Sequence, residues 1–353
     1  MAVGHETYAL SLYSMDDFIH ELEDEKAMAF FVGTGIDMTN VYPEGFPQGR
    51  DVKAHQMTWK QLLEELICHA CVNIEERRIL TEYASDLQAA VLKQKLGSSY
   101  IPIIQSWLYS RCNRRVLEAS YVYYDRYRKG EIPITEVPFY SQFVLGETIL
   151  LSRGIRAVVS QNYNNFISDT ISILQERQSD QPRKYRDIKA IEVYDGWREE
   201  KYVDNAFLIY HVHGYIPSPS GFQPKKEGSH IVLSQEEFYE MSKDVFSWQN
   251  STQIHFLTHH TCVLLGLSLN DLTTLRVLRH ANLDRSSEKV YGLMAIAGKN
   301  NTADQIDKQM KCRYFQTQHL HMIVEEDGYP ALYDKMLNSV YTHYDRHRDK
   351  SGK

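Results

Sequence analysis

The amino-acid sequence predicts an α/β protein built on a doubly wound parallel sheet. Apolar segments of strand length alternate along the chain with amphipathic segments of helix length. Several of the apolar segments end in glycine or in small polar residues, as buried parallel strands do. Helical patterns follow one another over about residues 60–152. We therefore expect an inserted α-helical layer within a single domain that spans residues 1–353.

The expected strands are marked by their apolar composition and by the turn residues around them. Two capping boxes, Thr58-x-x-Gln61 and Ser234-x-x-Glu237, predict the starts of two helices. A closing helix is expected over residues 329–345, and the polar tail over about 346–353 is expected to be disordered. The seven expected strands are residues 28–32, 156–160, 207–213, 230–233, 261–265, 289–295 and 320–324.

The composition argues against several classes of protein. With 353 residues, of which 24% are charged and 43% hydrophobic, the chain is ordinary for a globular protein with a large core. The net charge of −7 argues against broad binding to nucleic acid or to an anionic membrane. No apolar run approaches the roughly 20 residues that span a bilayer, and the N-terminus carries no signal-peptide pattern. We therefore expect a cytoplasmic protein with no membrane and no direct nucleic-acid partner.

Cysteine usage does not indicate a disulfide scaffold, because the chain has five cysteines, an odd number in a long sequence. Cys68 and Cys71 form a C-x-x-C spacing, but no second pair follows, and a structural zinc site needs four ligands. We interpret the pair as thiols buried on one helix face, and we expect no metal.

The stretch Ala27–Asp37, AMAFFVGTGID, is a candidate ligand-binding turn. Its apolar run ends in Gly33-Thr34-Gly35, and the two glycines allow the backbone to turn sharply and to approach a bound group closely. Free backbone N–H groups at such a turn would face phosphate in a nucleotide-binding domain. Met38 replaces the third glycine of the dinucleotide fingerprint, so a tight turn without a ligand stays open as an alternative.

Four expected strands end in polar residues or glycine. Ligands of open α/β sheets bind outside the carboxyl ends of the strands, so we expect the four ends to line one crevice. His213 at such an end is compatible with catalysis or with a structural role. His211 and His213 could also be two metal ligands on one strand face, although no further ligand cluster accompanies them. The four ends are Gly33-Thr34-Gly35, Gln161-Asn162-Tyr163-Asn164, His213-Gly214 and Gly266-Leu267-Ser268.

These motifs, in this order, resemble the sirtuin-like domain and, more closely, the bacterial sirtuin-like NAD hydrolases of anti-phage defence. The family motifs read G-A-G-x-S, T-x-N-Y-D, H-x-H-G or L-H-G, and G-x-S-x-x-D. The last of them corresponds here to Gly266, Ser268 and Asp271. The resemblance covers about residues 25–335. It implies a Rossmann-like fold with NAD as the bound nucleotide and substrate.

The resemblance also implies roles for individual residues. Asn162 would hold the nicotinamide ribose and position water, and His213 would act as general base or bind the ribose hydroxyls. Gly33, Thr34 and Gly35 would hold the pyrophosphate. Ser268 would contact the adenosine side. The whole expected NAD-binding set is Gly33, Thr34, Gly35, Asp37, Gln161, Asn164, Gly266, Ser268 and Asp271.

The chemistry of NAD cleavage suits these residue types. The nicotinamide–ribose bond breaks through an oxocarbenium-like state, as in glycoside hydrolysis, and the leaving group is a neutral pyridine that needs no acid. An oriented ribose and a base near neutral pH are needed instead. Asparagine orients without adding a charge, and histidine titrates near neutral pH.

Two departures from the family motifs matter for the site. Asp37 stands where the family has serine, and Asn164 stands where the family has an acidic residue after N-Y. In sirtuins that acidic position helps to seat the nicotinamide amide, although an amide can also hydrogen-bond an amide. The two zinc-binding cysteine pairs that protein deacylases of the family usually carry are missing from the sequence. This argues against deacylation.

The resulting hypothesis is an NAD glycohydrolase that yields nicotinamide and ADP-ribose and depletes NAD in abortive anti-phage defence. An unregulated NAD hydrolase would kill its host, so we expect a trigger. It would come from assembly into a homo-oligomer or from an activating partner of the same operon, such as a motor ATPase or a nucleotide-processing subunit. Two alternatives stay open: a non-catalytic subunit that senses NAD or ADP-ribose, and an NAD-dependent deacylase or ADP-ribosyltransferase.

Overall fold

The structure is a computed structural model of the chain. It describes residues 15, 18, 27–39, 41–42, 57–71, 73–177, 185–196, 205–219, 231–244, 246–267, 269, 272–281, 289–295 and 302–351.

Seven parallel strands form one sheet in the order β3-β4-β2-β1-β5-β6-β7. The central strand β1 pairs with β2 on one side and with β5 on the other, so the direction in which strands are added reverses at β1. Ligands of such sheets bind at this reversal, beyond the carboxyl ends of the strands. The expected doubly wound, Rossmann-like class is confirmed. The strands are β1 (Met28–Val32), β2 (Ile155–Ser160), β3 (Lys189–Val193), β4 (Ala206–His211), β5 (Thr261–Leu265), β6 (Val290–Ala295) and β7 (Leu320–Glu325).

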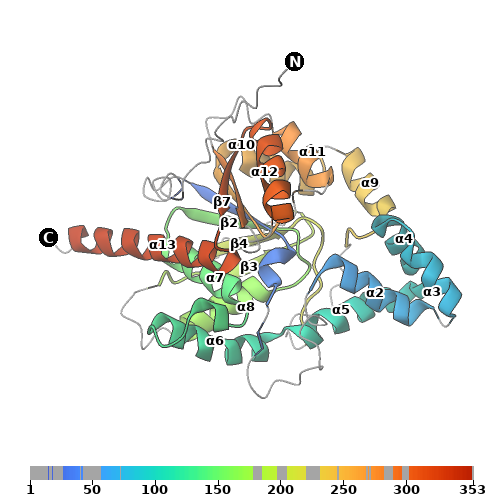
Figure 1. The fold of residues 1–353 in the computed structure, drawn as a ribbon, viewed down its shortest axis with the longest axis horizontal. Helices are drawn as coiled ribbons and strands as arrows, with labels where there is room; N and C mark the ends of the chain where they lie inside the picture. Colours follow the sequence, from blue (N-terminus) through green and yellow to red (C-terminus); the bar gives the residue numbers. More distant parts are fainter. Residues whose placement is uncertain are drawn as a thin grey trace.

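Helices cover both faces of the sheet. In Figure 1, α10, α11 and α12 lie above it, α6, α7 and α8 lie below it, and α2–α5 extend to the right. The segment between β1 and β2 contains α2 to α7, where the sequence predicts the inserted layer. The described helices are α2 (Trp59–Ala70), α3 (Ile74–Thr81), α4 (Ser85–Leu96), α5 (Tyr100–Arg111), α6 (Arg114–Arg128), α7 (Tyr140–Leu151), α8 (Phe166–Glu176), α9 (Gln235–Lys243), α10 (Trp248–His259), α11 (Leu272–His280), α12 (Thr302–Gln316) and α13 (Tyr329–Ser351), with 3-10 turns η1 (Thr34–Asp37), η3 (Gly97–Ser99) and η4 (Ile134–Glu136).

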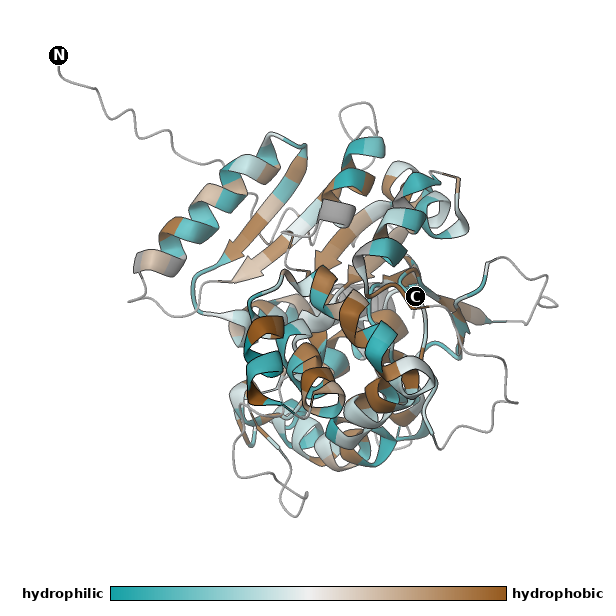
Figure 2. Ribbon diagram, turned by 90° about the vertical axis from the view of Figure 1, so that its right-hand side faces the viewer, coloured by the Kyte–Doolittle hydropathy of each residue, from teal (hydrophilic) through white to brown (hydrophobic). Residues whose placement is uncertain are grey.

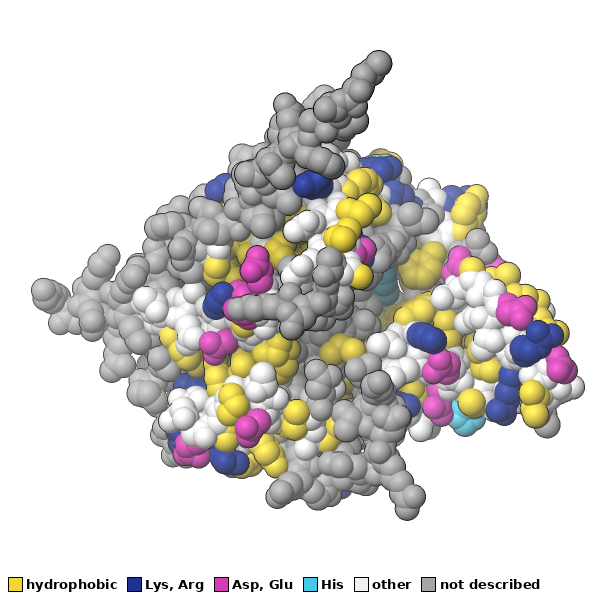
Figure 3. Space-filling view, in the orientation of Figure 1, with side chains coloured by type: hydrophobic (Ala, Val, Ile, Leu, Met, Phe, Trp, Pro, Cys, Tyr) yellow, Lys and Arg dark blue, Asp and Glu magenta, His cyan; other side chains and the backbone are white. Residues whose placement is uncertain are grey.

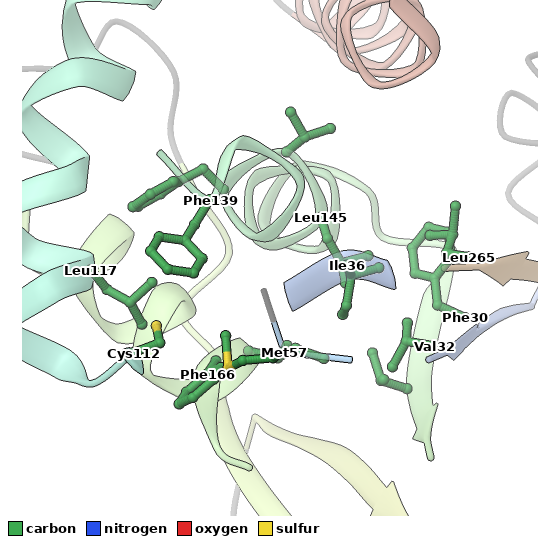
Figure 4. Packing of buried hydrophobic residues seen from close by; sticks show 14 of the residues in the cluster. Phe30, Val32, Ile36, Met57, Cys112, Leu117, Phe139, Leu145, Phe166 and Leu265 are labelled. Carbon is green, nitrogen blue, oxygen red and sulfur yellow. The ribbon is translucent and has the colours of Figure 1, made fainter. Parts of the chain in front are cut away.

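Alternate residues of β1 enter two separate cores, because successive side chains of a strand point to opposite faces. Phe30 and Val32 pack in the larger core with residues of α2, α7 and α8, whereas Ala29 and Phe31 pack in the smaller core with α10, α11 and α12. Figure 2 shows the hydrophobic strands enclosed between the helices. Figure 4 shows Ile36 of η1 between Val32 and α7, so the turn after β1 is anchored in the larger core.

Both predicted capping boxes are confirmed. The Thr58 side chain accepts from the Gln61 N–H, and the Gln61 side chain accepts from the Thr58 N–H. Ser234 and Glu237 form the same reciprocal pair. These contacts satisfy N–H groups that the first turn of a helix leaves without a partner. Among the helices that the structure describes, none is long and apolar enough to cross a membrane.

The strand predictions need three corrections. Residues 231–233 of the expected strand 230–233 are not a strand, and residue 230 lies outside the described residues. The edge strand β3 was missed, because its sequence KAIEV carries two charges and is only half-buried. The expected strand 207–213 ends at His211, since a turn follows and Gly214 has φ +97°. At the C-terminus, the helix expected over 329–345 continues to Ser351 and includes most of the expected disordered tail 346–353.

Candidate active site

The loops that follow β1 and β5 touch through three glycines. The Gly33 N–H donates to Leu265 O at 3.0 Å, and the Gly35 N–H donates to Gly266 O at 2.9 Å. A Cβ on Gly33 would lie 2.7 Å from Gly266 O, and a Cβ on Gly35 would lie 2.7 Å from Gly266 Cα. Gly266 has φ +62°, and a Cβ there would lie 2.6 Å from Ile36 N. Backbone atoms fill the space at all three positions, so none of the three can carry a side chain without a shift of the loops.

This contact explains the Gly-Thr-Gly turn through packing alone. The N–H groups of Gly33 and Gly35 already donate to protein carbonyls, so the prediction that they are free to face phosphate is wrong. Thr34, between the two glycines, is exposed. Binding of the pyrophosphate by this loop stays a prediction, and it would have to use groups other than these two amides.

Asp37, at the end of η1, accepts hydrogen bonds from three buried amide side chains. Its Oδ2 accepts from Nδ2 of Asn164 at 2.7 Å and from Nδ2 of Asn162 at 3.1 Å, while Oδ1 accepts from Nε2 of Gln142 on α7. Burial raises the pKa of Asp37 to about 7, against the lowering effect of the Asn164 and Gln142 hydrogen bonds and of nearby His211. We call Asp37, Gln142, Asn162 and Asn164 the amide–carboxylate cluster.

Within this cluster, Asn162 is oriented by two acceptors. It is 2% exposed, and its Nδ2 donates to Gly33 O at 3.1 Å and to Asp37 Oδ2 at 3.1 Å. Only the amide nitrogen can face two acceptors, so the orientation of the amide is fixed. Its Oδ1 is buried and accepts no hydrogen bond from the residues that the structure describes. A buried acceptor of this kind is normally satisfied by a donor, which a water or a ligand can provide.

The main chain of Asn162 is held by His211, the last residue of β4. His211 Nδ1 lies 2.8 Å from Asn162 O, and Nε2 lies 2.5 Å from Glu192 Oε2 on β3. A carbonyl only accepts, so Nδ1 carries a hydrogen, and the contact between Nε2 and the carboxylate oxygen needs a hydrogen on one of these two atoms. Ser168 Oγ hydrogen-bonds the other Glu192 oxygen. The sequence pointed to a ligand or a structural role for His211 but not to this contact.

His213 lies on the turn after β4, two residues beyond His211. It is 6% exposed, and its ring meets Phe238 of α9 edge to face at 5.6 Å between centroids. Its carbonyl accepts from the Val232 N–H at 2.8 Å. The expectation that both histidines share one strand face is wrong, because β4 ends at His211. The assignment of His213 as the base stays a prediction.

Two of the remaining predicted residues, Gln161 and Asn164, lie within the part of the chain that the structure describes. Gln161 Nε2 donates to Thr274 Oγ1 of α11 at 2.8 Å, which links the end of β2 to the segment after β5. Asn164 Oδ1 accepts from the Phe166 N–H at 3.2 Å at the start of α8. Ser268 and Asp271 lie outside the described residues.

The sequence patterns did not indicate two residues that contribute to the site, Gln142 and Glu192. Gln142 is 1% exposed within α7, whose sequence YSQFVLGETILL is otherwise largely apolar. A polar residue in such a helix is a signal, because it must be hydrogen-bonded when it is buried. Glu192 lies on β3, the strand that the sequence analysis missed, so its proximity to His211 could not be foreseen.

The structure bears on two expectations, the absence of a metal site and the burial of the Cys68 and Cys71 thiols. Among the residues it describes, no group of three or more His, Cys, Asp or Glu side chains is arranged to hold a metal ion. Cys71 is buried and Cys68 is exposed. The expectation that both thiols are buried on one helix face is therefore wrong for Cys68.

A separate groove of about 700 Å³ lies between α4 and α9. It shares no residue with the amide–carboxylate cluster, and Lys93 forms an ion pair with Glu237 on its wall. Figure 3 shows the surface hollowed between the helices α2–α5 and the rest of the molecule. The groove is lined by Leu87, Ala90, Val91, Lys93, Gln94, Gly97, Ser234, Glu236 and Glu237.

The fold and the amide–carboxylate cluster define a Rossmann-like α/β protein with a candidate nucleotide site at the carboxyl ends of its central strands. Residues 156–323 match the family model of the SIR2-like domain. The matched region begins in β2 and ends in β7, and it includes Asn162, His213 and Gly266. A SIR2-like domain implies NAD-related function and NAD binding in general terms. A comparison with curated proteins finds no match to the sequence.

Proposed function

We propose that this protein is an NAD glycohydrolase that cleaves the nicotinamide–ribose bond to give nicotinamide and ADP-ribose. The observation that carries the proposal is Asn162 Oδ1, a buried acceptor that no described residue satisfies, beside the turn after the central strand. The SIR2-like domain supports NAD as the ligand of this crevice.

The residues of the site suit a hydrolytic step. Asn162 Oδ1 would accept a hydrogen bond from a ribose hydroxyl or from the attacking water, and so orient it. The water oxygen forms a bond to C1′ of the ribose, while the bond from C1′ to the pyridinium nitrogen breaks and its electron pair leaves with neutral nicotinamide. His213 would take the proton that the water loses.

A role in anti-phage defence is part of the proposal. Depletion of NAD stops the metabolism of an infected cell, and such an activity must stay silent until infection. We therefore propose an activating trigger, through assembly of several copies of the chain or through a protein encoded beside it. The motif resemblance to defence NAD hydrolases supports this part of the proposal.

The test is chromatography of NAD after incubation with the purified protein, with and without the product of the neighbouring gene. Equal amounts of nicotinamide and ADP-ribose support the hydrolase. NAD that is bound but unchanged under every condition favours the sensing subunit instead. Consumption of NAD only in the presence of an acyl-lysine peptide favours a deacylase.

A further inference from the structure

We propose that Asp37 is a positioning residue that keeps the Asn162 amide turned with its oxygen toward the ligand space. The part of this inference that concerns the ligand rests on the proposed function. The orientation of the amide itself is a property of the protein and can be measured without NAD.

Three amide groups donate to Asp37: Asn162 and Asn164 to Oδ2, and Gln142 to Oδ1. Above its pKa of about 7 the Asp37 side chain is ionised and offers acceptors only, whereas a side-chain amide offers one oxygen and one NH₂ group. With Asp37 in place, turning Asn162 over would place its oxygen against Asp37 Oδ2 and Gly33 O, two acceptors.

The helical insertion holds this carboxylate in place. Ser141 Oγ of α7 donates to Ile36 O at 2.7 Å, directly before Asp37, and the neighbouring Gln142 reaches the carboxylate. Gln142 Oε1 is buried and accepts no hydrogen bond from the described residues. Gln142 can therefore turn its amide over and present an oxygen to a residue 37 that carries an NH₂ group.

Because the Gln142 amide can turn over, two double variants can be compared. Each keeps one carboxylate in the cluster, at residue 142 in the first and at residue 164 in the second. In Asp37→Asn/Gln142→Glu, the NH₂ group of residue 37 is drawn to the new carboxylate at 142. Its oxygen still accepts from Asn162 and Asn164. The amide of Asn162 therefore keeps its orientation.

In Asp37→Asn/Asn164→Asp, the new carboxylate is at residue 164. The NH₂ group of residue 37 then turns toward this carboxylate and occupies the position of Oδ2, next to Asn162 Nδ2. Two donors then oppose each other, and Asn162 turns over. Both variants have the same net charge, and each has one carboxylate and three side-chain amides in the cluster.

The experiment measures hydrogen exchange of the Asn162 side-chain NH₂ group by NMR, in protein labelled with isotope-enriched asparagine and assigned by loss of the signal in Asn162→Ala. Melting temperatures confirm that each variant folds. We expect slow exchange in the wild type and in Asp37→Asn/Gln142→Glu, and exchange at least about ten times faster in Asp37→Asn/Asn164→Asp, because the Asp37 hydrogen bond is lost. Equal exchange in the two double variants would overturn the proposal.

A second readout addresses the ligand. Calorimetric Kd values for NAD and ADP-ribose should differ roughly ten-fold between the two double variants, with tighter binding by Asp37→Asn/Gln142→Glu. Exchange rates that differ between the two double variants as expected, combined with equal affinities of the two variants for NAD and ADP-ribose, would overturn the claim that the oriented oxygen serves the ligand. A wild type that binds neither compound would contradict the proposed function, while the exchange comparison would still decide the role of Asp37.

Discussion

The Asp37 carboxylate accepts a 2.7 Å hydrogen bond from Asn164, and both residues stand at positions where the chain departs from the sirtuin-like motifs. The motifs have a serine at the position of Asp37 and an acidic residue at the position of Asn164. In this chain the acidic residue of the contact is therefore residue 37, whereas in the motifs it is the residue at position 164. The two departures compensate each other, because a carboxylate still meets a hydrogen-bond donor within the buried cluster.

Substitution of Gly266 by alanine should destabilise the fold. The left-handed backbone at φ +62° costs an L-residue roughly 1–2 kcal/mol, and overlap of the new Cβ with Ile36 N adds typically about 1–3 kcal/mol. Thermal or denaturant unfolding measures the loss. Gly130→Ala is the matched control, because Gly130 also has a positive φ (+73°) but no atom lies within 4 Å of its Cβ position. Equal losses in the two variants would contradict the tight contact between the loops.

The stability of the protein should decrease as pH rises through the range in which Asp37 ionises. Its folded pKa of about 7 lies above the ordinary value of 3.8, so the folded state holds a proton that the unfolded state has released. The contribution of Asp37 to stability is complete below about pH 4 and is lost as pH rises to about 7. Between about pH 5 and pH 7 this amounts to about 2–3 kcal/mol.

Denaturant unfolding of the wild type and of Asp37→Asn across this range isolates the effect, because the other titrating groups are common to both proteins. We expect the difference in unfolding free energy between the two proteins to change with pH. Parallel pH curves would show that the carboxyl group does not titrate between about pH 4 and pH 7.

His213→Ala should reduce kcat far more than it weakens NAD binding, because a base acts mainly in the transition state. If His213 is the base, kcat/KM of the wild type should fall toward acid pH as the imidazole is protonated, and this inflection should disappear in the variant. Burial raises the pKa of Asp37 to about 7, so Asp37 can also produce an inflection near neutral pH. An inflection that survives in His213→Ala would therefore assign it to another group, with Asp37 the first candidate.

His211→Ala is the control for His213. It removes the contacts with Asn162 O and with Glu192 and leaves a buried carboxylate without this partner. A loss of about 1–3 kcal/mol of stability follows, with the pH inflection retained. Loss of the inflection in His211→Ala alone would reverse the roles of the two histidines.

The sequence predicted the fold better than it predicted the site. Six of the seven expected strands formed because buried parallel strands are apolar throughout, and β3 was missed because an edge strand can carry charges such as Lys189 and Glu192. The convergence of the Gly33 turn with Asn162 followed from the topology of the sheet. The involvement of Gln142 and Glu192 could not be predicted, because it depends on tertiary contacts between elements far apart in the sequence.

The central claim is most directly tested by the rate of nicotinamide release from NAD by the wild type and by Asn162→Ala, each with the product of the neighbouring gene present. Loss of the oriented amide should raise the barrier by about 2–4 kcal/mol, a rate loss of about 30-fold to 10³-fold. Asn162 is buried, so melting temperatures must show that the variant remains folded at the assay temperature. We predict nicotinamide release by the wild type and release near background by the folded variant. Equal rates for the two proteins, or a wild type that binds NAD and never cleaves it, would contradict the account.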